Sequence, residues 1–265
     1  MILRKLPMLV IFVCVVVLLY LSWLIVLPNL VTQRHSLIFD ACIQPNTVAL
    51  TFDDGPYNLT WIGISQLIKA NVAATFYVTG KDVVKCPELI RFMDDHPLFM
   101  LASHTFNHLN LGAVKSALAV TEDVNRGFEA LFNITGKRYR HFRLPYSSFD
   151  QFDLVKHSYP MAVDLYTIEV SDWSIEYAVN SLNLTLKRKV DSVARQTLNA
   201  LKDAWKRLRE KEKEKEKGDS SGGIIYLGHN RELIFRGLHK IIAFFKSLEL
   251  RFVRMDECTG VPEIY

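Results

Sequence analysis

Strand-like apolar runs alternate with helix-like segments through most of this sequence. Residues 72–78 form one such β-rich run, which Gly80 ends. A helix is predicted next at 87–95, because proline suits the first helical turn, and a short apolar strand follows at 98–102. Strands that alternate with helices form parallel βα units. The sequence therefore predicts an α/β fold, either a barrel or an open doubly wound sheet.

Further segments continue the same alternation. Nearly half of the 265 residues are hydrophobic (49%), which is enough for one sizeable core. Apolar residues at helical spacing predict further helices at 61–70, 111–131 and 232–247. Further strands are expected at 161–165, 168–170, 223–227 and 251–255.

The N-terminal region has the pattern of a membrane anchor. Arg4 and Lys5 precede an uncharged, mostly apolar stretch at 6–27, which is long enough to cross a bilayer as a helix. The stretch is long for the apolar region of a signal peptide, and 28–30 offers no small-residue cleavage site. We expect a single-pass type II protein: residues 1–5 cytoplasmic, 6–27 a signal anchor, 28–41 a short linker and 42–265 a lumenal or extracellular domain. Secretion after signal cleavage is the alternative.

Glycosylation signals and charge agree with that placement. Three Asn-x-Ser/Thr triplets fall on the predicted outer side and give it weak support, at Asn58, Asn133 and Asn183. The net charge is only +4, and residues 206–217 alone, with seven Lys/Arg and four Glu, carry a surplus of +3. The rest of the chain is close to neutral, which argues against nucleic acid as a partner.

The cysteine pattern fits an oxidising compartment. Cys14 lies in the predicted span, and three cysteines follow it. Cys42 lies near the start of the predicted domain and Cys258 near its end, so a disulfide between the two is plausible and would leave Cys86 over. Spacing alone does not establish this pairing.

A charged insertion is expected at about 187–222. Strict Glu-Lys alternation at 210–217 places opposite charges at i,i+3 but like charges at i,i+4, so only a marginal helix is predicted there. We predict a solvated insertion between two elements of the fold. A docking arm for a partner or for anionic lipid is the alternative.

Two polar clusters directly follow predicted strands. Asp53 and Asp54 come after an apolar run that ends at Phe52, and neighbouring carboxylates repel each other unless a cation or a proton intervenes. An Asx turn is the ordinary explanation for this pattern. His104 and His108 are spaced at i,i+4, and in a helical turn both rings could bind one cation. An aspartate from another strand end would be the third ligand, leaving open positions as in catalytic zinc-type sites.

Five stretches in this order resemble the polysaccharide deacetylases, the NodB-like enzymes of carbohydrate esterase family 4. They are residues 51–56, 104–108, 143–146, 172–173 and 227–229. The likeness covers about residues 42–260, and the fold that it implies is a distorted (β/α) barrel with its site at the carboxyl ends of the strands.

The resemblance implies a metal-dependent hydrolysis. Asp54, His104 and His108 would hold a divalent metal, zinc in the first place and cobalt as a possibility. Asp53 would be the general base for the attacking water, and Arg143 would pair with it and keep it ionised.

The same resemblance assigns the remaining roles. His229 would be the general acid that protonates the leaving amine, with Asp172 supporting its charged form. The backbone N–H of Tyr146 would stabilise the oxyanion. Trp173 and Leu227 would form the walls of the pocket for the acetyl methyl group.

The sequence also departs from the family pattern at four places. Glu169 stands where a shorter Asp is usual, and Asn230 where Asp is usual. Leu144 replaces a common proline and Ser147 a common glycine. None of these changes removes an implied metal ligand, base or acid, but they alter the loops and the pocket.

The function implied is deacetylation of N-acetylglucosamine polymers by a membrane-anchored enzyme. The predicted anchor and the glycosylation signals favour chitin over peptidoglycan. One alternative is an inactive relative that binds wall polysaccharide, and another is an adaptor that works through the anchor and the Lys/Glu segment.

Overall fold

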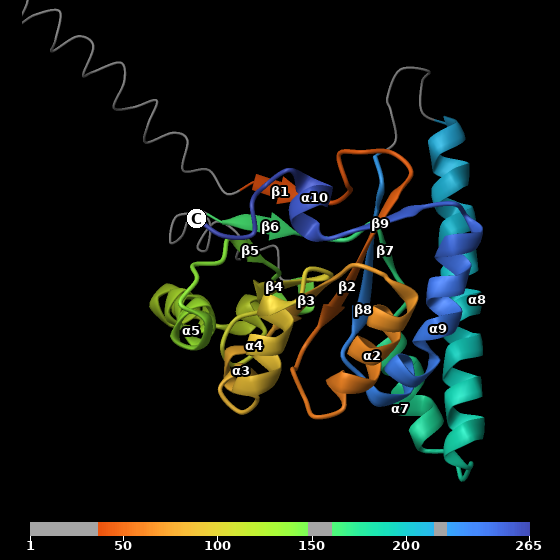
Figure 1. Cartoon of the computed structure of the whole chain (residues 1–265), viewed down its shortest axis with the longest axis horizontal. Coiled ribbons are helices and arrows are strands. Elements are labelled where there is room, and N and C mark those ends of the chain that lie inside the picture. The colour runs from red at the N-terminus through yellow and green to blue at the C-terminus, as the bar shows by residue number, and fades with distance from the viewer. Residues whose placement is uncertain (1–36, 148–160, 215–221) are drawn as a thin grey trace, which may run out of the picture.

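A curled, wholly parallel sheet forms the centre of the molecule (Figure 1). This computed structural model describes residues 37–147, 161–214 and 222–265. The strand order is β1-β6-β5-β4-β3-β2-β8-β7, and β9 pairs with β2 beside this path. The strands are β1 Leu37–Phe39, β2 Thr47–Asp53, β3 Ala74–Val78, β4 Phe99–Ser103, β5 His141–Phe142, β6 Ala162–Asp164, β7 Ile168–Glu169, β8 Ile224–His229 and β9 Arg251–Val253.

The sheet curls into a half-barrel with helices around it. Within the described residues no ladder joins the two edge strands, β1 and β7, so the expected distorted barrel is found in an open form. The helices are α2 Thr60–Ala70, α3 Gly80–Val83, α4 Pro87–Asp95, α5 Ala117–Thr135, α7 Asp172–Asn180, α8 Leu186–Glu214, α9 Glu232–Ser247 and α10 Met255–Thr259, with short 3₁₀ turns at η1 Leu111–Ala113 and η2 Pro145–Ser147.

Strand β2 is the central element. All seven of its residues are buried, as expected for a strand covered on both faces. One edge pairs with β8 along its length, while the other edge pairs with β9 at its start and with β3 at its end. Asp53 therefore lies in register with His229 of β8 on one side and with Tyr77 of β3 on the other. This register places the chemically important side chains at one end of the sheet.

Aromatic packing holds the helices to the sheet. The Phe52 ring lies 5.6 Å from Phe76 and 5.2 Å from Phe235 of α9, and Phe76 lies 5.7 Å from Phe99. Full burial of each such ring contributes about 1.5–3 kcal/mol of transfer free energy. The cluster fixes α9 against β2, the strand that carries the two aspartates.

Three expectations from the sequence need correction. The predicted linker at 28–41 contains strand β1, so the domain begins before residue 42. The predicted helix at 111–131 is instead the turn η1 followed by α5, because Ser116 accepts a hydrogen bond from the Ala119 N–H and caps a helix that begins at Ala117.

Helix α8 is the third difference. Instead of a solvated insertion, most of it packs against α9 and α7, and Val193 and Leu201 are fully buried (Figure 1). Lys240 of α9 also forms an ion pair with Asp191 (3.2 Å). The helix continues into the Glu-Lys region as far as Glu214. Apolar side chains along one face of α8 pack against α9 and α7. The local charge pattern gives no information on this tertiary packing.

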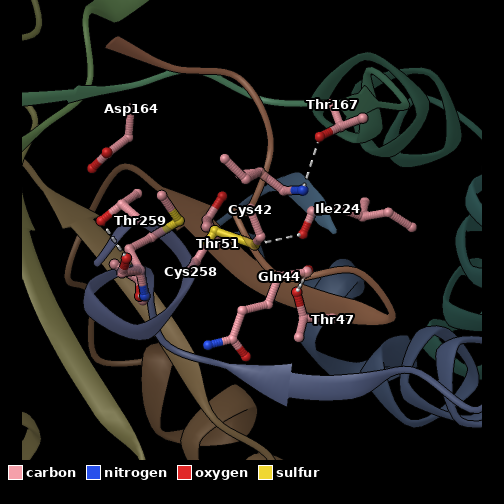
Figure 2. Close-up of a disulfide and its surroundings, with 12 residues drawn as sticks. Cys42, Gln44, Thr47, Thr51, Asp164, Thr167, Ile224, Cys258 and Thr259 are labelled. Carbon is pink, nitrogen blue, oxygen red and sulfur yellow. Dashed lines mark hydrogen bonds between the residues drawn. A yellow bond between two sulfur atoms is a disulfide. The ribbon is translucent and has the colours of Figure 1, made fainter. Parts of the chain in front are cut away.

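A disulfide joins the two ends of the described domain (Figure 2). Cys42 and Cys258 are bonded across 216 residues, which confirms the pairing that was plausible from the sequence, and Cys86 is a free, half-buried thiol. The backbone of Cys42 also exchanges two hydrogen bonds with Gly223, at 3.1 and 2.8 Å. The segment before β2 is thereby tied to α10 and to the start of β8.

The predicted membrane span at 6–27 lies outside the described residues. Among the residues that the structure describes, none of the helices combines the length and the apolar character needed to cross a bilayer.

Candidate active site

The turn after β2 separates the two neighbouring aspartates. Asp54 and Gly55 both have left-handed backbone angles, with φ of 72° and 71°. A Cβ atom at Gly55 would lie 2.4 Å from Nδ2 of Asn230, so only glycine fits this turn without a shift. Fully buried Asn230 holds the turn from outside: its N–H donates to the Asp53 carbonyl (2.8 Å), and its Oδ1 accepts from Thr60 Oγ1 (2.9 Å).

Asp54, His104 and His108 come together at this end of the sheet. Their potential ligand atoms all lie within 4.8 Å of one another, and Asp54 Oδ1 is 3.2 Å from His108 Nε2. Nδ1 of His104 donates to the Arg143 carbonyl (2.8 Å), so Nε2 presents its lone pair. Burial and His104 lower the pKa of His108, which favours the neutral ring that a metal requires.

This set of donors fits a divalent cation of the zinc type. One carboxylate and two imidazoles are the ligands of open, catalytic sites, and the hydrogen bond on His104 fixes its ring in the tautomer that can bind.

The two histidines do not lie in a helical turn, as their spacing suggested. Thr105 and His108 have left-handed φ values of 64° and 59°, and the segment is an irregular loop. Asp123 of α5 stabilises it, because its carboxylate accepts hydrogen bonds from the Asn107 N–H (3.1 Å) and Nδ2 (2.6 Å). The rings nevertheless converge, with centroids 4.9 Å apart.

Asp53 is paired with a buried arginine. Nη1 of Arg143 lies 2.7 Å from Asp53 Oδ1 and also donates to Thr51 Oγ1 (2.7 Å). Burial alone would raise the pKa of Asp53, but the guanidinium of Arg143 brings it below the usual value. The carboxylate is therefore ionised at neutral pH. Its other oxygen, Oδ2, is 3.8 Å from His104 Nε2.

His229 is paired with a second aspartate. Asp172, at the start of α7, accepts from His229 Nδ1 (2.6 Å) and from the His229 backbone N–H (2.9 Å). Burial would lower the pKa of His229, yet the adjacent Asp172 carboxylate raises it to about 9. The ring is therefore an imidazolium at neutral pH, with Nε2–H as its second proton.

A cavity of about 600 Å³ connects these groups. Nine of the ten site residues predicted from the sequence line it, and the tenth, Asp172, lies behind His229. Tyr146 and Trp173 are exposed at the cavity, Leu227 is buried, and the Tyr146 ring lies 4.9 Å from that of His108. The structure therefore brings the residues predicted from the sequence together around one cavity.

Two further residues of the cavity wall were not singled out from the sequence. Tyr166 follows β6, and Arg231 comes two residues after His229. Their positions directly after strand ends are the only sequence signal that could have identified them. Glu169 and Ser147, which depart from the family pattern, also line the cavity.

Comparisons with known proteins relate this half-barrel and its site to the polysaccharide deacetylases. Residues 40–156 match the family model described as polysaccharide deacetylase. A chitin deacetylase of Colletotrichum lindemuthianum is 35% identical over 116 residues, covering 41% of this chain and 45% of that protein. The peptidoglycan-N-acetylmuramic acid deacetylase PdaA of Bacillus subtilis is 30% identical over 128 residues, covering 48% of each chain.

A solved structure shows the same fold over most of the chain. The Bc1960 peptidoglycan N-acetylglucosamine deacetylase superposes with a TM-score of 0.65 at 20% identity, covering 92% of this chain and 98% of that one. The chain spans less than half the length of the curated relatives named above. Residues 40–156 therefore match a polysaccharide deacetylase domain, and the chain is similar to chitin and peptidoglycan deacetylases in sequence and in fold.

Proposed function

We propose that this protein hydrolyses the acetamide of N-acetylglucosamine units in a polysaccharide and releases acetate. One observation carries the proposal: the ionised Asp53 and the protonated His229 open onto the same cavity as the Asp54–His104–His108 cluster. A base and an acid whose environments push their pKa values apart are what amide hydrolysis near neutral pH needs.

Asp54, His104 and His108 would hold a divalent cation, zinc being our first expectation and cobalt the second. When bound, such a cation acts as a Lewis acid that lowers the pKa of water and polarises the substrate carbonyl.

Asp53 would act as the general base. Its Oδ1 is held by Arg143, which leaves Oδ2 to accept the proton of the attacking water. The same ion pair keeps the carboxylate ionised and fixes its direction. The backbone N–H of Tyr146 would stabilise the negative charge that develops on the carbonyl oxygen.

His229 would act as the general acid. Its Nδ1–H is bound to Asp172, so Nε2–H is the proton available to the leaving amine. When the C–N bond breaks, this proton passes to nitrogen and the product is a free amine beside acetate. Trp173 and Leu227 would enclose the acetyl methyl group.

Chitin is the substrate that we propose within this class. Relatives named as chitin deacetylases and as peptidoglycan deacetylases support the class. The predicted anchor at 6–27 and the glycosylation signals favour chitin and a type II membrane protein with its domain outside the cytosol.

The test is acetate release from N-acetylglucosamine oligomers and from peptidoglycan fragments by the full chain in detergent. We expect release from the chitin oligomers that stops with a chelator and returns with added zinc. Release from peptidoglycan alone would contradict the choice of chitin. No release from either, with polysaccharide still retained by the metal-loaded protein, would favour the binding-only alternative.

A further inference from the structure

A buried array of charged groups lies beneath the site. Beyond its contact with Asp53, Arg143 donates from Nε to the Asp164 carbonyl (3.1 Å) and from Nη2 to the Leu165 carbonyl (2.8 Å). Its guanidinium carbon lies 3.9 Å from the ring centroid of Tyr77. The Tyr77 hydroxyl in turn donates to Asp164 Oδ2 (2.7 Å). The same arginine therefore pairs directly with the Asp53 carboxylate and contacts the main chain of the fully buried Asp164, whose carboxylate adds a weaker electrostatic influence on the guanidinium.

His141 is the residue that balances Asp164. Its Nδ1 lies 2.7 Å from Asp164 Oδ2, and its Nε2 lies 2.9 Å from the Val261 carbonyl oxygen. A carbonyl can only accept, so Nε2 carries a proton. An ionised carboxylate can also only accept, so Nδ1 carries one too.

The shared proton of this pair belongs on the histidine. Oδ2 of Asp164 also accepts a hydrogen bond from the Tyr77 hydroxyl, so this oxygen is the acceptor for both neighbours. Burial opposes a charge on the ring, but Asp164 raises the pKa of His141 above its ordinary value. Among the described residues, Asp256 of α10 is the further acid that acts on the ring.

Charges then alternate from the cavity to the C-terminal segment. The order is Asp53 negative, Arg143 positive, Asp164 negative and His141 positive. We propose that His141 is a charged positioning residue. Its imidazolium neutralises Asp164, so that the positive charge of Arg143 remains available to stabilise the Asp53 carboxylate. This inference rests on the proposed function, in which Asp53 is the base.

The far end of this array is anchored by the disulfide. Val261 follows α10, which holds Cys258, and the Val261 N–H donates to Thr259 Oγ1 (3.2 Å). Figure 2 shows Asp164 and Thr259 in the surroundings of the Cys42–Cys258 bond. The acceptor for His141 Nε2 is therefore fixed by a covalent link to the start of the domain.

Nitrogen NMR of the wild-type full chain tests the charge itself. With ¹⁵N-labelled histidine, we expect the signals of His141, identified by their loss in His141→Gln, to show protons on both ring nitrogens from pH 6 to pH 8. A bare Nδ1 in this range would overturn the proposal. This result does not depend on turnover, so it separates the present inference from a failure of the proposed function.

A pair of variants tests the effect on catalysis. His141→Gln leaves Asp164 unbalanced, and we expect kcat to fall by roughly tenfold with little change in KM. His141→Gln/Asp164→Asn removes both charges and should recover most of kcat, although the hydrogen bonds of the imidazole are still missing. A double variant as slow as the single one would show that His141 is merely structural and would overturn the proposal.

Discussion

Asp53 and Asp54 are neighbours in the chain but have different partners. Asp53 faces Arg143, while Asp54 faces His108, because the left-handed backbone at Asp54 turns the second carboxylate away from the first. The repulsion that two adjacent carboxylates would suffer is relieved separately, by a guanidinium for one and by the histidine cluster for the other.

This separation predicts different losses for the two aspartates. Asp53→Asn should lower kcat by about 10²–10⁴-fold and keep the metal, because the three ligand residues remain. Asp54→Asn should lose metal and activity together. The measurements are acetate release and elemental analysis of the purified protein, with Asp203→Asn on the exposed face of α8 as the control. Unchanged acetate release by Asp53→Asn would contradict its role as the base.

The His229–Asp172 pair predicts the alkaline limit of activity. Because the pKa of His229 is raised from 6.5 to about 9, the ring stays protonated through neutral pH and loses its proton near pH 9. A general acid must be protonated, so kcat should fall as the pH rises through about 9. Asp172→Asn removes the main cause of the raised His229 pKa and should move the alkaline fall in kcat toward neutral pH.

The raised pKa of His229 also makes the stability of the fold fall with rising pH, as it does for kcat. A folded pKa above the unfolded value means that His229 stabilises the fold fully below about pH 6.5 and that this contribution is lost as pH rises through about 9. Urea unfolding between pH 6 and 10 measures the effect. A pH dependence that is identical in wild type and Asp172→Asn would contradict the pairing.

At the scale of elements, local patterns predicted those helices whose ends are set locally. The predictions for α4 and α9 have the observed ends, because proline and amphipathic spacing lie within each segment. The 104–108 segment is an irregular loop rather than the helical turn that its i,i+4 spacing would allow, because its support is Asp123, which lies on another element. The segment of α8 was predicted to be a solvated insertion, because the packing of α9 against it cannot be read from its own sequence.

The packing of α8 has a direct test. Leu201→Ala should lower the free energy of unfolding by about 2–5 kcal/mol, because the side chain is fully buried. Its neighbour Lys202 is exposed, and Lys202→Ala should change the free energy of unfolding by no more than about 0.5 kcal/mol. Equal, small effects of the two substitutions in urea unfolding would support the solvated insertion expected from the sequence.

Helix α7 carries two exposed aromatic rings one turn apart. Trp173 lines the cavity, and Tyr177 follows at i,i+4 on the same face of the helix with 79% of its surface exposed. A polymer that extends from the site along this face would cover the Tyr177 ring. Tyr177→Ala should then raise KM for long oligomers by about two- to tenfold, the equivalent of roughly 0.5–1.5 kcal/mol.

The ring, rather than the hydroxyl, should carry this effect. Tyr177→Phe is the matched control and should keep the KM of the wild type. The N-acetylglucosamine dimer, which we expect to be too short to extend from the cavity to Tyr177, should be hydrolysed equally by all three proteins. An equal increase in KM for the dimer and for long oligomers would point to a change in the site itself.

At the scale of the whole molecule, the sequence pointed to the residues around the cavity but not to the buried residues that support them. The five motifs lie at the carboxyl ends of strands of one parallel sheet or shortly after them, which is the placement that the family resemblance implied. His141 carried no comparable signal, because its partners Asp164 and Val261 lie 23 and 120 residues away and on separate elements. Contacts of this range appear only once the chain is folded.

The disulfide holds this long-range arrangement together. It closes a loop of 216 residues, and its loss should lower the free energy of unfolding by roughly 2–5 kcal/mol, mainly because the unfolded chain gains freedom. Cys42→Ser/Cys258→Ser should show this loss in urea unfolding, whereas Cys86→Ser should not, since Cys86 is a free thiol. The double variant should also lose kcat, because the segment that holds His141 Nε2 is no longer anchored at Cys258. Lower stability with an unchanged kcat would show that the bond stabilises the fold without supporting the charged array.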